Sequence, residues 1–262
     1  MSFAKILFAE LLKLRRSRIT WITFVAYGAG PLIGALFMII LKDPALGQRT
    51  GLIAAKARWS AGSADWPTYL SMMLQMTSVA GMILIGVIAA YIFGREYAEG
   101  TAKNMLALPI HREWFILGKV AVILIWFAAL SAAFCMETWL VGLLVGLPGY
   151  STALVLHFMA VDLESAALLI LLCPVTAWTA LAGKGYFAPL GATIFTLILG
   201  MVFGSTGWAP WVPWSIVPLF AGVAGPEAQQ SIGAGSYALL AAVFIVGAAG
   251  AMIHINRADN TQ

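Results

Sequence analysis

The chain has 262 residues, of which 61% are hydrophobic and only 10% charged, and its formal net charge is +4. Soluble domains carry about 25% charged residues, and a soluble fold of this length has too little interior to hide so much apolar side chain. This composition excludes an ordinary soluble protein. The basic residues lie at the ends of apolar runs and form no long stripe, so we expect no nucleic-acid partner.

The first eighteen residues are predicted to form an amphipathic helix. Phe3, Leu7, Leu11 and Leu14 follow helical spacing on one face. The remaining face is charged, with Lys5, Glu10, Lys13, Arg15, Arg16 and Arg18. A basic amphipathic helix before a membrane span should lie in the interface, with its apolar stripe in lipid. The alternative is a helix that packs on a partner protein.

Six apolar segments follow, and each has about the 20 residues needed to cross a ~30 Å hydrocarbon core, or more. They run over Ile19–Leu41, Tyr69–Phe93, Phe115–Leu147, Leu154–Ala182, Tyr186–Gly204 and Tyr237–Ile255. We therefore predict an all-α integral membrane protein, a single transmembrane domain over 1–262 with six transmembrane helices. Cys135 and Cys173 fall inside apolar runs at different depths, so we expect two packing residues rather than a disulfide.

The basic residues predict the orientation of the chain. With the N-terminus in the cytoplasm, four of them fall on the outer side, namely Lys42, Arg49, Lys56 and Arg58. Eleven fall on the inner side: Lys5, Lys13, Arg15, Arg16, Arg18, Arg95, Lys103, Arg112, Lys119, Lys184 and Arg257. This asymmetry obeys the positive-inside rule, so both termini are predicted to be cytoplasmic.

The inner loop over 94–114 is the most charged stretch after the N-terminal segment. Gly100 interrupts the helix that leaves the second span, and Thr101 is suited to cap a new short helix. Pro109 then ends that helix and suits the start of the next one. These residues predict a short charged helix held at the membrane face. The alternative is an ordinary solvated inner loop.

This loop also resembles a known family. It contains Arg95-Glu96-Tyr97, then Glu99-Gly100-Thr101, then Leu106-Ala107-Leu108-Pro109, and then Arg112 and Lys119. That order, together with the N-terminal run from Glu10 to Arg18 and the six-span plan, resembles the ABC-2 type permeases of ABC transporters. The chain looks most similar to the small bacterial permeases of peptide-antibiotic and multidrug export systems.

The resemblance implies an ABC-2 (type V exporter-like) architecture in the bacterial plasma membrane. It also implies partners: a separate ATP-binding cassette subunit, a second permease chain and membrane lipid. The loop between spans two and three would be the coupling helix that docks on the ATPase, through Arg95, Glu96, Glu99, Gly100, Thr101, Lys103, Asn104, Leu106, Pro109 and Arg112. No G-x-x-x-x-G-K-[ST] motif occurs, so ATP and Mg are expected on the partner and no cofactor on this chain.

Three carboxylates lie in apolar surroundings: Glu137, Asp162 and Glu164. Counting 1.5 Å per residue from Lys119 and Lys184 puts Glu137 and Glu164 near the outer interface. All three are predicted to form an acidic outer rim that favours cationic substrates. The alternative is that these carboxylates are simply exposed to water at the outer ends of their helices. Asp162 and Glu164 are two residues apart and cannot share one helix face, which makes a single shared site doubtful.

The last outer loop, over 205–236, carries Trp208, Trp211 and Trp214 together with three prolines. The resemblance implies short re-entrant helices at the outer end of the pathway. An interfacial loop with an aromatic belt is the other interpretation.

The predicted function is the permease subunit of an ATP-driven exporter for a drug, antimicrobial peptide or lipid-like substrate. A gradient-driven carrier or channel is the alternative, but it needs charged or polar groups near mid-membrane, where the sequence has few. A membrane enzyme ranks last, because no converging catalytic set or metal-ligand motif occurs. Substrate identity and the choice between homodimer and heterodimer stay open.

Overall fold

The computed structural model describes residues 3–43, 62–101 and 112–257, and every regular element in these ranges is a helix. The helices are α1 (Phe3–Arg15), α2 (Arg18–Lys42), α5 (Trp66–Ala98), α7 (Arg112–Val145), α8 (Thr152–Ala182), α9 (Phe187–Gly204), the short 3₁₀ helix η1 (Ala209–Trp211), α10 (Pro213–Phe220), α11 (Pro226–Gln230) and α12 (Ala234–Arg257). Two helix starts are fixed by side chains. Ser17 caps α2 by accepting from the Ile19 amide, and Asp65 caps α5 by accepting from the Thr68 amide.

Six of these helices, α2, α5, α7, α8, α9 and α12, are long and apolar enough to cross a membrane. Each matches one predicted apolar segment, so the predicted six-span all-α fold is confirmed. Helix α5 is longer than its predicted apolar segment, Tyr69–Phe93. At 33 residues α5 is about 50 Å long, against a hydrocarbon core of about 30 Å. Its charged last turns therefore extend beyond the apolar layer.

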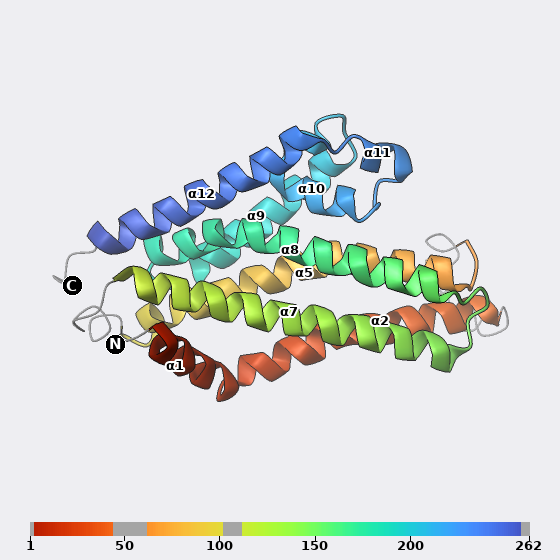
Figure 1. The fold of residues 1–262 in the computed structure, drawn as a ribbon, viewed down its shortest axis with the longest axis horizontal. Helices are drawn as coiled ribbons and strands as arrows, with labels where there is room; N and C mark the ends of the chain where they lie inside the picture. Colours follow the sequence, from red (N-terminus) through yellow and green to blue (C-terminus); the bar gives the residue numbers. More distant parts are fainter. Residues whose placement is uncertain (1–2, 44–61, 102–111, 258–262) are drawn as a thin grey trace.

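The spans run lengthwise through one elongated bundle (Figure 1). Helices α2 and α7 pack together along one side, α5 and α8 run through the middle, and α9, α10 and α12 cover the other side. The beginning of α1 and the end of α12 lie at the same end of the bundle, which we call the terminal end (Figure 1, left). The last turn of α5 and the first turn of α7 also lie there.

The N-terminal helix α1 ends at Arg15, three residues before its predicted end at Arg18, and the chain turns into α2 at Ser17. Its predicted apolar stripe packs on protein. Leu7, Leu11 and Leu14 lie against the buried core, and α1 contacts α7. The prediction that this stripe faces lipid was wrong, because the first turns of α7 extend far enough to cover it. Phe8, outside the stripe, is 68% exposed.

The Trp- and Pro-rich segment over 205–236 forms η1, α10 and α11. A proline stands in the first turn of each. Helix α10 packs against α9, where Gly200 lets the Trp214 backbone approach so closely that a Cβ would lie 2.6 Å from its carbonyl oxygen. Trp208 and Trp211 are exposed, whereas Trp214 is partly buried. The broken helices expected here are therefore present; their depth in the membrane stays a prediction.

Helices α8 and α12 make the most extensive contact in the bundle, and it depends on glycine. A Cβ at Gly247 would lie 2.6 Å from the Val175 backbone nitrogen and 2.8 Å from the Pro174 carbonyl carbon. Backbone atoms cannot rotate away as side chains do, so an added methyl group must push the two helices apart.

We expect Gly247→Ala to destabilise the protein by about 1–3 kcal/mol and to lower the Tm of the detergent-solubilised chain by about 5 °C. Gly191→Ala is the matched control, because Gly191 also lies inside a span and a Cβ there would meet nothing within 4 Å. The control should leave the Tm unchanged or slightly raised. Equal losses in both variants would contradict close backbone packing of α12 on α8.

Candidate functional site

The last turn of α5 carries the first residues of the predicted coupling segment. Gly100 has φ +69°, its amide donates to the Tyr97 carbonyl, and the Thr101 amide donates to the Glu96 carbonyl at 2.8 Å. This pattern is a Schellman ending, which needs a left-handed residue that glycine adopts without strain. The prediction that Gly100 interrupts this helix is confirmed. The chain leaving α5 is thus turned at a defined residue.

Part of the predicted coupling set lies outside the described residues: Lys103, Asn104, Leu106 and Pro109. Arg112 is the first residue of α7. The short helix expected after Thr101 falls in the same range, and its docking role stays a prediction.

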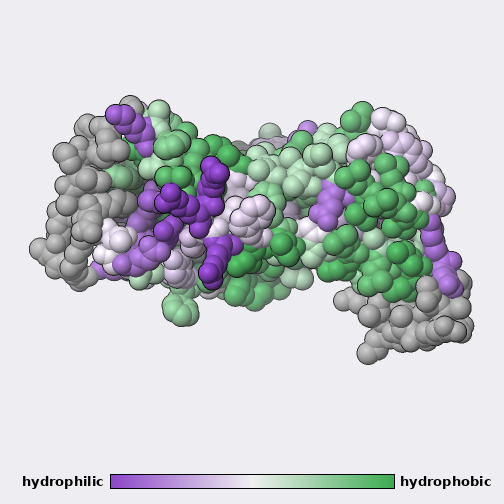
Figure 2. Space-filling view, turned by 90° about the horizontal axis from the view of Figure 1, so that it is seen from below, coloured by the Kyte–Doolittle hydropathy of each residue, from purple (hydrophilic) through white to green (hydrophobic). Residues whose placement is uncertain are grey.

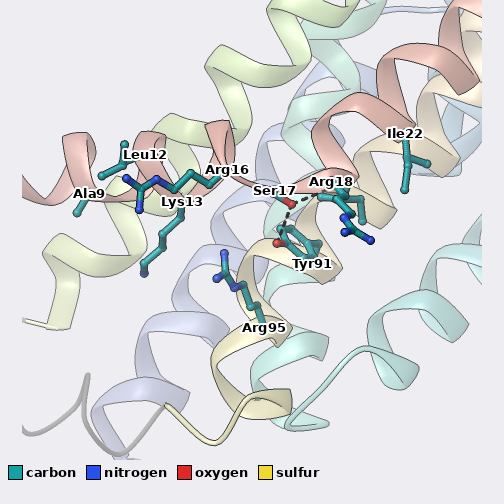
Figure 3. Close-up of a pocket in the computed structure, with 10 residues that line it drawn as sticks. Ala9, Leu12, Lys13, Arg16, Ser17, Arg18, Ile22, Tyr91 and Arg95 are labelled. Carbon is teal, nitrogen blue, oxygen red and sulfur yellow. Dashed lines mark hydrogen bonds between the residues drawn. The ribbon is translucent and has the colours of Figure 1, made fainter.

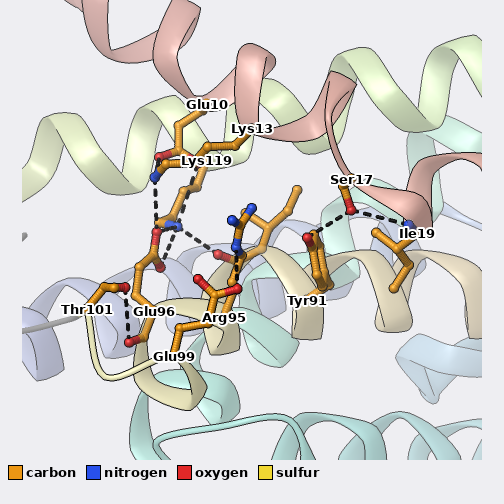
Figure 4. A network of polar contacts seen from close by, with 11 residues as sticks. Glu10, Lys13, Ser17, Ile19, Tyr91, Arg95, Glu96, Glu99, Thr101 and Lys119 are labelled. Atoms are coloured by element: carbon orange, nitrogen blue, oxygen red, sulfur yellow. Dashed lines mark hydrogen bonds and ion pairs between the residues drawn. The ribbon is translucent and has the colours of Figure 1, made fainter.

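Glu96 faces inward and forms the centre of a buried ion cluster (Figure 4). Lys119 of α7 donates to both Glu96 carboxylate oxygens, at 2.6 and 2.7 Å, and to the Ile92 carbonyl at 2.7 Å. Lys119 is 3% and Glu96 6% exposed. The Lys119 ammonium thus makes three short hydrogen bonds, and both carboxylate oxygens of Glu96 accept one of them. A buried ion pair requires this geometry.

Helix α1 adds a second pair to this cluster. Lys13 donates to Glu10 at 2.5 Å and lies 3.4 Å from the Glu96 carboxylate, while Glu10 lies 3.8 Å from the Lys119 ammonium. Burial by itself lowers the pKa of Lys13, but the two neighbouring carboxylates outweigh it and raise that pKa above its ordinary value. Two ammonium groups and two carboxylates therefore join α1, α5 and α7 at the terminal end.

Arg95 and Glu99 lie on the outer side of the same helix turn. The Arg95 Nε donates to Glu99 at 2.9 Å, and its guanidinium lies 5.7 Å from the centre of the Tyr91 ring. The Tyr91 hydroxyl in turn accepts from Ser17 at 2.8 Å. The Glu99 side chain is 50% exposed. Of these predicted coupling residues, Glu99 is thus exposed and Arg95 partly exposed, whereas Glu96 is buried.

The predicted acidic rim is not one site. Asp162 is completely buried, which contradicts its placement on an exposed rim. Glu164 is exposed, and Glu137 is half-buried against α2, where its carboxylate leaves no room for a Cβ at Gly28. The two α8 carboxylates face opposite environments because residues two apart point about 200° apart around a helix.

Asp162 instead belongs to a buried polar cluster between four spans. Its carboxylate accepts from the Thr77 hydroxyl at 2.5 Å and from the Cys135 thiol at 3.3 Å. The Tyr27 hydroxyl donates to Thr77 at 3.3 Å. Helices α2, α5, α7 and α8 each supply one group. In the described ranges no basic side chain pairs with Asp162.

Both cysteines are buried and free, as expected. Cys135 is more than a packing residue, however, because it donates to Asp162. Sequence reasoning missed this contact, and it placed Lys119 on the inner side and in the family pattern without predicting its pairing with Glu96. Both depend on how neighbouring helices are rotated about their axes.

The chain is similar to known transporter proteins. The profile of the ABC-2 family transporter proteins matches residues 6–200. The chain is also 32% identical over 197 residues to the bacitracin transport permease protein BCRB of Bacillus licheniformis, an alignment that covers 73% of this chain and 91% of that protein. The profile match includes both the Glu96–Lys119 pair and the Asp162 cluster. It favours the predicted permease over a gradient-driven carrier. The chain therefore belongs to the ABC-2 family of transporter proteins, as a membrane permease subunit of an ABC exporter.

Proposed function

We propose that this permease forms a translocation path for a drug, antimicrobial peptide or lipid-like substrate, powered by a separate ATP-binding subunit that docks at the terminal end. A bacitracin transport permease among its relatives supports peptide antibiotics as one substrate class. The path requires a second permease chain, either another copy or a related chain. The orientation that we propose, with both termini in the cytoplasm of a bacterial plasma membrane, rests on the excess of inner-side basic residues.

The observation that carries the docking proposal is the difference in exposure between neighbouring charged residues at the end of α5. Arg95 and Glu99 are presented outward, one turn before the loop that resembles the coupling segment. In the same turn, Glu96 is buried, is bound to Lys119 of α7 and lies near Lys13 of α1. A push on the exposed face is therefore transmitted to three helices as a rigid unit, the kind of motion by which domains are coupled.

The test begins with the intact chain, expressed in its own host and purified together with any ATP-binding subunit that it retains. We expect the complex to hydrolyse ATP, and Arg95→Ala with Glu99→Ala to reduce assembly or coupled hydrolysis by about tenfold, the effect of losing ~1.4 kcal/mol of interface energy. Failure of any ATPase to copurify would contradict an ATP-driven permease.

The matched control is Glu164→Ala with Glu227→Ala, which removes two exposed charges, in α8 and α11, away from the terminal end. This variant should assemble and hydrolyse ATP normally. If the Arg95 and Glu99 variant also behaves like the unchanged protein, the outer face of α5 is not part of the ATPase interface.

A further inference from the structure

A cavity of about 700 Å³ lies at the terminal end, in the angle between α1, α2 and the last turns of α5 (Figure 3). Its polar lining consists of four basic residues and two hydroxyls: Lys13, Arg16, Ser17, Arg18, Tyr91 and Arg95. Figure 3 shows Lys13 and Arg95 extending into the space between α1 and α5, with Arg16 and Arg18 on either side. The bend between α1 and α2 therefore creates a basic concave surface.

The charge of this cavity is only partly neutralised. Lys13 is paired with Glu10, and Arg95 with Glu99. Over the described ranges, by contrast, neither Arg16 nor Arg18 is bound to a carboxylate. Guanidinium groups bind phosphate oxygens through paired hydrogen bonds. The cavity thus has two available guanidinium groups and an excess of positive charge, which suits an anion.

The rest of the cavity lining is apolar and consists of Ala9, Leu12, Ile19 and Ile22, which we call the apolar wall. Ile22 is 62% exposed, so this lining is open to the outside. The apolar surface continues along α2 through Trp21 and Val25, which are 71% and 73% exposed. In the view of Figure 2, hydrophilic side chains gather towards one end of the molecule and border directly on a hydrophobic surface. A free inorganic anion gains no binding energy from apolar surface, whereas an acyl chain does, because both apolar surfaces are removed from water.

We propose that this cavity binds the phosphate headgroup of an anionic phospholipid, with an acyl chain lying along the exposed face of α2. Basic pockets at the membrane face of transmembrane helices recognise such headgroups. Arg16 and Arg18 bind the phosphate, and Ser17 and Tyr91 provide hydroxyls beside it. The bound lipid holds the angle between α1 and α2, next to the cluster that joins α1 to α5. This site is independent of which substrate the permease moves.

The experiment uses the intact, delipidated chain in a zwitterionic detergent, without any ATPase. Dissociation constants and Tm shifts are measured with short-chain phosphatidylglycerol, with phosphatidylcholine of the same chain length, and with inorganic phosphate. We expect the unchanged protein to prefer phosphatidylglycerol. Arg16→Gln with Arg18→Gln should weaken that binding at least about tenfold, because two charge-assisted contacts are lost.

The control is Arg15→Gln with Arg257→Gln, which removes the same charge from exposed residues that do not line the cavity. It should retain phosphatidylglycerol binding within about twofold. Equal weakening in both variants would mean nonspecific charge attraction, and equal affinity for both lipids would mean no headgroup site. Either result overturns the proposal. Binding of inorganic phosphate as tightly as the lipid would overturn it as well, since the apolar wall would then contribute nothing. The Tm of each variant without lipid verifies that it is folded.

Discussion

Replacing Lys119 by methionine should destabilise the bundle by about 3 kcal/mol, because the change leaves a buried carboxylate without its main partner. Glu96 is 6% exposed and receives two short hydrogen bonds from Lys119. Losses after breaking a buried pair run to about 3–5 kcal/mol. We expect the lower end of that range, since Lys13 stays 3.4 Å from the same carboxylate.

The double variant Lys119→Met with Glu96→Gln should recover most of this loss. Methionine fills the volume of the lysine stem, and glutamine keeps the shape of the glutamate without its charge. The measurement is the thermal or denaturant unfolding midpoint of the purified chain, arranged as a double-mutant cycle with both single variants. A double variant as unstable as the sum of the two single variants would mean that the two residues do not act as a pair.

Arg95→Met provides the matched control, because Arg95 is next to Glu96 on the same helix. Arg95 forms its ion pair with Glu99 on the exposed side, where such pairs are worth about 0.5 kcal/mol or less. We therefore expect a small change in unfolding midpoint. The contrast between two charge deletions at one end of α5 tests whether burial, rather than charge count, makes the Glu96–Lys119 pair important.

The second large effect is expected at Asp162. Asp162→Ala removes the acceptor for the Thr77 hydroxyl and the Cys135 thiol and leaves a void where four helices meet. An unsatisfied buried donor costs about 1–3 kcal/mol, and the void adds to that. We expect a total loss of about 2–4 kcal/mol. Asp162→Asn keeps an acceptor of the same shape and should lose no more than about 1 kcal/mol.

The unfolding midpoints of both Asp162 variants are compared with that of Glu164→Ala. Glu164 lies two residues further along α8 and is exposed, so its removal should change stability by no more than about 0.5 kcal/mol. If Asp162→Asn were as damaging as Asp162→Ala, the charge itself would be required. The role of this residue as a hydrogen-bond acceptor between spans would then be wrong.

Much of the architecture follows directly from the sequence. An apolar run of sufficient length must become a helix in lipid, since a bilayer core offers no other partners for backbone groups. The six predicted spans correspond to α2, α5, α7, α8, α9 and α12 for that reason. Gly100 likewise ends α5 as predicted, because a left-handed turn residue acts locally on the backbone.

The partners of the charged residues were decided only by the tertiary structure. Glu96 and Lys119 are separated by 23 positions, and their meeting depends on the rotation of α5 and α7 about their own axes. The same rotations bury Asp162 while leaving Glu164 exposed, and they place the apolar stripe of α1 against α7 rather than lipid. Apolar composition specifies that a segment crosses the membrane, but it is nearly the same all around each helix. The sequence therefore determined the spans and the family, while only packing determined which face of each helix meets which neighbour.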